Sequence, residues 1–243
     1  MTRSTRPRLL LVPEFTEVEW DQIRPLLEEW AEVASYDPPG VGGEPESDTF
    51  DRSAIVRRGL EEVDRRRWEQ FFVASDSWGI ASAVPLAAAR PEAIDGLALG
   101  HAKLSFRRDG PRAPLNAGVH EAMTELVKTD HEQFLRYGAV QATGGSINEE
   151  QAERMIKRFP RELMQRGWAM ITRDDADLGE PLAKLDCPLL FAKHEGCLGS
   201  TEEGFEDAAT AFPQATTISV RAAPLASPAF AEALRQFCLA AKS

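Results

Sequence analysis

The chain has 243 residues and carries 28 Lys and Arg residues against 39 Asp and Glu residues, which gives a formal net charge of −11. This acidic balance argues against nucleic acid and anionic membranes as partners, because both attract positively charged surfaces. The hydrophobic share of 43% is too high for a disordered chain and is sufficient for a sizeable core. The length allows one large domain or one domain with an insertion.

The sequence also bears on compartment and redox state. The apolar run at 9–12 is too short for a membrane span or for the apolar part of a signal peptide. Three cysteines, Cys187, Cys197 and Cys238, are an odd number without a close pairing motif, so we interpret them as thiols. These features predict a cytoplasmic protein without a membrane partner.

Short apolar segments alternate with longer amphipathic ones, a pattern typical of a mostly parallel sheet with helices on both faces. About six strands are expected, at 8–13, 31–36, 71–74, 94–100, 188–192 and 216–220. Helices are expected at 17–30, 51–68, 78–90, 201–212 and 227–240. The sequence therefore predicts an α/β fold.

One long segment breaks this alternation. Residues 103–173 show helical patches with no strand pattern between them. Within this segment, Ser146 and Glu149 form a capping-box signal for a helix that runs toward Phe159. We therefore expect a core made of 1–102 and 174–243, with a helical lid inserted at 103–173.

The informative motif lies after the third expected strand, where the chain reads Ser75-Asp76-Ser77-Trp78-Gly79. A buried strand that runs through such a turn into a helix meets the mechanical requirement for a nucleophile elbow, with Ser77 at the tip. Small residues are needed at Ser75 and Gly79 because the turn brings the strand and helix backbones close together. The amide of Trp78 would then point at a developing oxyanion.

With this elbow and this order of elements, the sequence resembles the α/β-hydrolase family in its small, lid-bearing form. The resemblance covers nearly the whole chain. Residues 9–15 resemble the first strand with its oxyanion loop, and 185–192 resemble the strand that leads to the acid of the catalytic triad. The resemblance implies an α/β-hydrolase fold with Ser77 at the nucleophile position and the amides of Phe15 and Trp78 as oxyanion donors.

The other triad positions depart from the family pattern. Cys197 stands where the resemblance places the aspartate, and Glu195 is the closest substitute. Arg221 stands where the resemblance places the histidine, and 219–243 contains no histidine. A guanidinium cannot accept a proton at neutral pH, so Arg221 cannot activate Ser77. The resemblance therefore implies a degenerate triad.

Other residues offer a replacement base. Glu14 lies in the expected oxyanion loop, either as a desolvated proton acceptor or as a solvated loop acid. His101 ends the strand before the insertion, at the edge where active-site loops gather, and can reach Ser77 from an unusual side. His194 is similarly placed, but its charged neighbours favour exposure.

We expect neither a metal ion nor an organic cofactor. Cys187 and His194 bracket a strand of about 20 Å at roughly 3.3 Å per residue, so they cannot share one ion. The glycine-rich segment at 40–43 follows no dinucleotide-binding or phosphate-binding pattern.

Two functional hypotheses follow. In the first, the pocket performs non-hydrolytic chemistry on a small molecule or binds a ligand, with Arg221 as the anchor of an anionic group. In the second, the chain is a serine hydrolase for a small ester or thioester with a rebuilt triad. Its base is then His101 or His194, and its acid is Glu195 or Glu14. The sequence specifies neither the substrate nor the oligomeric state.

Overall fold

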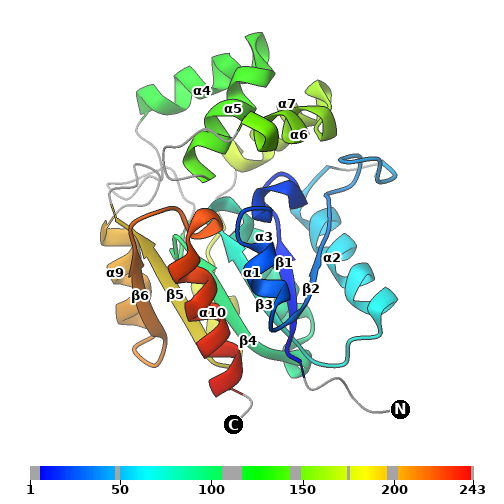
Figure 1. Ribbon diagram of the computed structural model, residues 1–243. Helices are drawn as coiled ribbons and strands as arrows, with labels where there is room; N and C mark the ends of the chain where they lie inside the picture. The colour runs from blue at the N-terminus through cyan, green and yellow to red at the C-terminus, as the bar shows by residue number, and fades with distance from the viewer. Residues whose placement is uncertain are drawn as a thin grey trace.

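In the computed structural model, six parallel strands form one sheet in the order β2-β1-β3-β4-β5-β6 (Figure 1). The strands are β1 (Arg8–Val12), β2 (Glu32–Ser35), β3 (Phe71–Asp76), β4 (Ile94–Gly100), β5 (Leu189–His194) and β6 (Thr216–Val220). The structure describes residues 6–46, 50–105, 117–142, 149–173, 176–195 and 202–241, with the backbone alone at 117–120, 138–142 and 173. The expected parallel sheet of about six strands is confirmed.

Helices cover both faces of the sheet. They are α1 (Arg24–Glu28), α2 (Arg52–Arg66), α3 (Ile80–Ala89), α8 (Gly179–Ala183), α9 (Glu202–Ala211) and α10 (Pro228–Ala240). Four short 3-10 helices join them: η1 (Glu17–Trp20), η2 (Ser77–Gly79), η3 (Pro91–Ala93) and η4 (Pro224–Ala226). One apolar cluster joins the sheet to α2, α3, α8 and α9, and a second joins its other face to α1 and α10. The central strand β3 is buried along its whole length.

The region expected as one helix at 17–30 is instead divided into η1 and α1, so this prediction is wrong. Thr16 caps η1, and the side chain of Glu19 folds back onto the backbone before it, which closes a single tight turn. Pro25 then lies in the first turn of α1, where its missing N–H costs no helical hydrogen bond. The capping box of η1 and Pro25 at the start of α1 together override the helical spacing of the apolar residues.

Four further helices lie together beyond the carboxyl ends of the strands, at the top of Figure 1. They are α4 (Ala117–Thr129), α5 (His131–Ala142), α6 (Glu149–Arg158) and α7 (Arg161–Arg173). The ring of Phe15, in the loop after β1, packs edge to face on Phe134 and Phe159 of this layer, at centroid distances of 6.0 and 6.1 Å. Ser146 lies outside the described residues. In the part of the chain that the structure describes, every helix is too short or too polar to cross a membrane.

Polar contacts attach α6 to the segment around η1. The amide nitrogen of the Gln151 side chain donates to the carbonyl oxygens of Val18 and Glu19, at 3.0 and 3.3 Å. One turn further along the helix, Arg154 forms an ion pair with Asp21 at 2.8 Å. The α4–α7 layer is thus held against the loop that follows β1.

Candidate active site

Ser77 lies at the tip of the turn between β3 and α3, where the sequence analysis expects it. Its backbone has φ +51°, a left-handed conformation that costs an L-residue about 1–2 kcal/mol. A Cβ atom built on Gly79 would lie 2.6 Å from Oγ of Ser75 and 3.1 Å from the backbone of Pro13. The turn therefore has the strained, closely packed geometry of an elbow.

This geometry predicts an inverted order of stability for two substitutions. We expect Ser77→Gly to be more stable than Ser77→Ala by about 1 kcal/mol, because glycine adopts positive φ without strain. Urea unfolding of both variants measures the difference. In the interior of α3, where φ is helical, Ser82→Gly should instead be less stable than Ser82→Ala by about 1 kcal/mol. The same order at both positions would contradict a strained elbow.

His101 follows β4 and also has φ +51°. Its Nδ1 lies 2.7 Å from Oδ1 of Asp76, and both side chains are buried. Asp76 is paired in register with Gly100, where an added Cβ would lie 2.3 Å from Oδ1 of Asp76. Glycine at this position therefore leaves room for the carboxylate that orients His101.

Asp76 is a residue of this site that was not expected from the sequence. Its side chain comes next to Ser77, at the end of a strand adjacent to the one that carries His101. The consecutive strands of a βαβ unit often lie side by side, so this pairing was the available signal.

His194 ends β5 and lies against the same pair. Its Nδ1 is 3.2 Å from Nε2 of His101. The ring is half-buried, so the expected exposure is wrong. Burial and then the neighbouring His101 lower the pKa of His194.

The expected oxyanion loop is occupied from within the chain. The carboxylate of Glu19 accepts hydrogen bonds from the amides of Phe15 at 2.6 Å, and of Glu14 and Thr16 at 2.9 Å each. An oxyanion would have to displace this carboxylate before it could use the Phe15 amide, the expected oxyanion donor. Glu19 was not expected at this site from the sequence, although Thr16-x-x-Glu19 has the spacing of a capping box.

Two carboxyl groups at this loop have perturbed acidity. Burial raises the pKa of Glu19 to about 7, against the opposing effect of its hydrogen bonds from backbone amides. Glu14 is half-buried, and burial, followed by the charges of Glu19 and Asp76, raises its pKa well above the ordinary range for glutamate. These surroundings favour the desolvated alternative for Glu14 over the solvated one.

A lysine that the sequence analysis did not assign lies beside the elbow. Lys103 is buried, and its Nζ lies 4.6 Å from the ring centroid of Trp78, as in a cation–π contact. Trp78 itself packs against both the core and the α4–α7 layer. The charge of Lys103 also lowers the pKa of Glu14, which places the ammonium group in the electrostatic environment of this site.

Two of the expected site residues have exposed side chains. Glu195 is exposed in the turn after β5, and Arg221 is exposed directly after β6. Cys197 lies outside the described residues. The carboxylate that the structure brings to a histidine is Asp76, and neither Glu195 nor Arg221 is buried with it.

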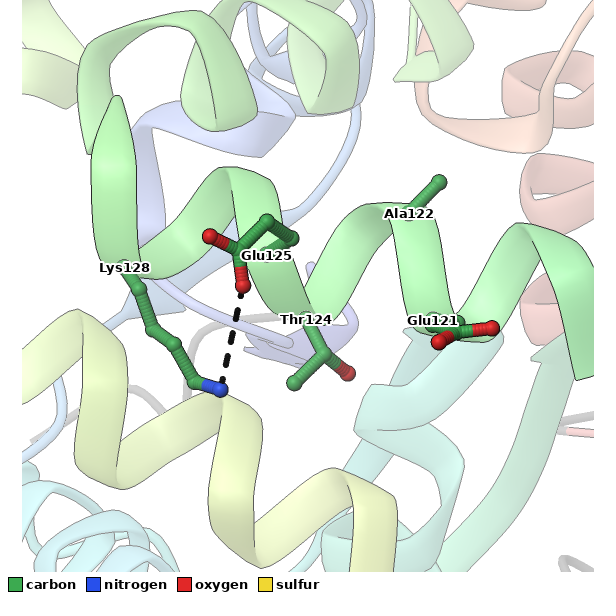
Figure 2. Close-up of a pocket in the computed structure, with 5 residues that line it drawn as sticks. All are labelled: Glu121, Ala122, Thr124, Glu125 and Lys128. Atoms are coloured by element: carbon green, nitrogen blue, oxygen red, sulfur yellow. Dashed lines mark ion pairs between the residues drawn. The ribbon is translucent and has the colours of Figure 1, made fainter.

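Within the described ranges, no group of three or more His, Cys, Asp or Glu side chains is arranged to hold a metal ion. Figure 2 shows a pocket of about 430 Å³ along α4, lined by Glu121, Ala122, Thr124, Glu125 and Lys128. Lys128 and Glu125 form an ion pair there at 4.0 Å. This pocket is formed along one helix of the α4–α7 layer and includes none of the elbow residues.

Comparison with protein-family models gives no match, and comparison with curated proteins gives none either. Solved structures do match. A hydrolase from Oleispira antarctica is 15% identical over 98% of this chain and 93% of its own, with a TM-score of 0.76. A bromoperoxidase from Bacillus anthracis is 16% identical over 96% and 92%, and a carboxylesterase from Nitrososphaera gargenis is 12% identical over 100% and 93%, both with TM-scores of 0.76. At these identities the likeness concerns the fold, and this chain has the α/β-hydrolase fold.

Proposed function

We propose that this chain is an enzyme that performs non-hydrolytic proton transfer on a small molecule. The observation that carries the proposal is the engagement of the Phe15 amide by the carboxylate of Glu19 at 2.6 Å. Ester hydrolysis depends on such donors, because removal of one oxyanion donor costs a factor of about 10²–10³ in kcat. A loop filled by an internal carboxylate favours a reaction that forms no tetrahedral oxyanion.

The pair Asp76–His101 supports catalysis over ligand binding alone. A carboxylate that accepts a hydrogen bond from an imidazole orients the ring and stabilises its cation, which is what a general base requires. Nδ1 of His101 lies 2.7 Å from Oδ1 of Asp76, the residue that precedes Ser77 in the elbow. In this proposal His101, oriented by Asp76, is the base, and Ser77 donates a hydrogen bond to the substrate.

Glu14 supports the same chemistry as a proton donor. Its raised pKa means that the carboxyl group keeps a proton at pH values where an exposed glutamate has lost it. A protonated carboxyl group and a neutral histidine in one site can act as acid and base. The proposed substrate is therefore a small molecule that loses a proton at one atom and gains one at another.

The degenerate triad implied by the family resemblance belongs to this proposal, since Arg221 cannot act as a base. Anchoring of an anionic substituent is now assigned to Lys103. Its ammonium group lies beside Trp78 and is buried, whereas Arg221 is exposed. The α4–α7 layer is proposed as the lid over this site.

A second candidate function has one specific observation in its favour. Ser77 has the left-handed backbone of a nucleophile, and the oriented His101 follows the neighbouring strand. A rebuilt triad of Ser77, His101 and Asp76 would make the chain a serine esterase or thioesterase. Glu19 would then have to release the Phe15 amide during each turnover.

Deuterium exchange tests the proposed function. In D₂O, we expect the chain to exchange the acidic C–H protons of small carbonyl compounds, and His101→Gln should slow this exchange by about 100-fold. His131→Gln, in α5, is the control and should leave the rate unchanged. A fluorophosphonate should label Ser77 slowly. Rapid labelling that disappears in His101→Gln would establish the esterase and contradict the proposal.

A further inference from the structure

Three titratable side chains form one row of hydrogen bonds at the carboxyl ends of β3, β4 and β5. Asp76 and Nδ1 of His101 are 2.7 Å apart, and Nε2 of His101 and Nδ1 of His194 are 3.2 Å apart. The two rings meet edge to face, with centroids separated by 5.3 Å. The row begins at a buried carboxylate and ends at a half-buried imidazole.

Counting protons along the row leaves two arrangements. A carboxylate only accepts hydrogen bonds, so Nδ1 of His101 carries the proton that faces Asp76. When His101 is neutral, its Nε2 has a lone pair and must accept from Nδ1–H of His194. When His101 is cationic, its Nε2–H donates to the lone pair on Nδ1 of His194. In both arrangements, Nε2 of His194 is the ring nitrogen outside the row.

We infer that His194 is the residue through which the Asp76–His101 pair gains and loses its proton. When a proton arrives, a new N–H bond forms at Nε2 of His194. The Nδ1–H bond of the same ring breaks, and that proton moves to Nε2 of His101. One proton enters at His194, and one positive charge appears on His101 beside the carboxylate. The catalytic meaning of this relay rests on the proposed function, since it names where the proposed base exchanges its proton.

The surroundings favour the uptake of only one additional proton by the two neutral rings. Among the described residues, Glu14 and Glu19 after β1 and Glu195 after β5 interact with the row, and Lys103 after β4 acts on Glu14. The backbone of Arg221, after β6, forms a hydrogen bond with His194. Asp76, the Arg221 backbone and Glu195 favour protonation of His194, whereas burial and a charge on His101 oppose it. A second proton would place two cations in adjacent rings, which like-charge repulsion disfavours. We therefore expect the pair to take up one proton in a shared step.

Nitrogen-15 NMR of the whole chain tests the relay, because the sequence holds only 4 histidines. At basic pH, both His101 and His194 should carry their proton on Nδ1. On acidification, one step should convert His101 to the imidazolium and move the His194 proton from Nδ1 to Nε2. His131 reports the behaviour of a histidine outside the row in the same spectra. The inference is overturned if His194 carries its proton on Nε2 across the whole titration.

Two substitutions separate a relay from a merely structural role. His194→Asn keeps a hydrogen-bonding group near the position of Nδ1 but cannot pass a proton on. In this variant we expect the pH midpoint of His101 to shift by about 1 unit and its proton exchange with water to slow. Asp76→Asn should lower the midpoint of His101 by about 1 unit or more. An unchanged His101 titration in a folded His194→Asn variant would also overturn the inference.

The NMR titration needs no substrate, so the relay and the proposed function can fail separately. If the NMR titration shows the shared step but no carbon acid exchanges deuterium, the proposed function fails and the relay stands. If deuterium exchange depends on His101 and is unchanged in His194→Asn, the proposed function stands and the relay fails.

Discussion

Arg158→Ala is expected to lower the free energy of unfolding by about 3 kcal/mol, because it leaves a buried carboxylate without its cation. Nε of Arg158 donates to Oδ2 of Asp37 at 2.9 Å, its Nη2 also contacts Asp37, and Nη2 donates to Glu17 at 2.8 Å. Asp37 is 3% exposed and would keep only its hydrogen bonds from Thr16 and the Glu17 amide among those described here. Breaking a buried pair costs about 3–5 kcal/mol, and the partial exposure of Arg158 places this one at the lower end.

The same substitution should loosen the α4–α7 layer, because Arg158 ends α6 and Asp37 follows β2. Urea unfolding measures the stability, and limited digestion with chymotrypsin measures the loosening without depending on arginine. Arg154→Ala is the matched control: its ion pair with Asp21 joins the same helix to the core, but both side chains are more exposed. Exposed pairs contribute about 0–1 kcal/mol. Equal losses in the two variants would contradict a buried anchor at Asp37.

Much of the fold could be predicted from hydrophobic periodicity. The strands 94–100 and 216–220 have the bounds expected from the sequence, and the helix at 51–68 appears as α2, with Asp51 as its N-cap. The failure at 17–30 has a local cause, since periodicity indicates which residues are buried and does not indicate where a capping box or a proline starts a new helix. The residues that form turns decide such boundaries, and hydrophobic periodicity does not detect them.

The candidate site could be predicted only in part. Ser77 was found from a local motif, which needs nothing beyond neighbouring residues. The partners of His101 depend on which strands lie side by side and in what register, and the pairing of Asp76 with Gly100 is a property of the assembled sheet. His194 was expected to be exposed because of its charged neighbours, whereas its contact with His101 comes from the adjacent strand.

Between pH 5 and pH 8, the wild-type chain is expected to lose about 3 kcal/mol of stability relative to Glu19→Gln. Burial raises the pKa of Glu19 in the folded chain from 4.5 to about 7. Between these two values the folded state holds a proton that the unfolded chain has released. Raising the pH therefore favours unfolding, and this loss begins above pH 4.5 and is complete above about pH 7. Glutamine does not ionise, so the variant lacks this loss.

The quantity to measure is the difference between the two unfolding free energies at each pH, because contributions from groups that do not interact with Glu19 then cancel. The charge of Glu19 also raises the pKa of Glu14, so the difference includes the response of Glu14 to the substitution. Glu19→Gln also loses the second carboxylate oxygen, which accepts from the Glu14 amide at 2.9 Å, so the variant starts less stable at pH 5. Its deficit should shrink or reverse by pH 8. Glu29→Gln removes the same charge from an exposed position after α1 and is the matched control for the loss of one carboxylate. Parallel curves for Glu19→Gln and wild type would mean that the loop amides stabilise the Glu19 carboxylate fully, and the closed oxyanion loop would then be equally stable at every pH.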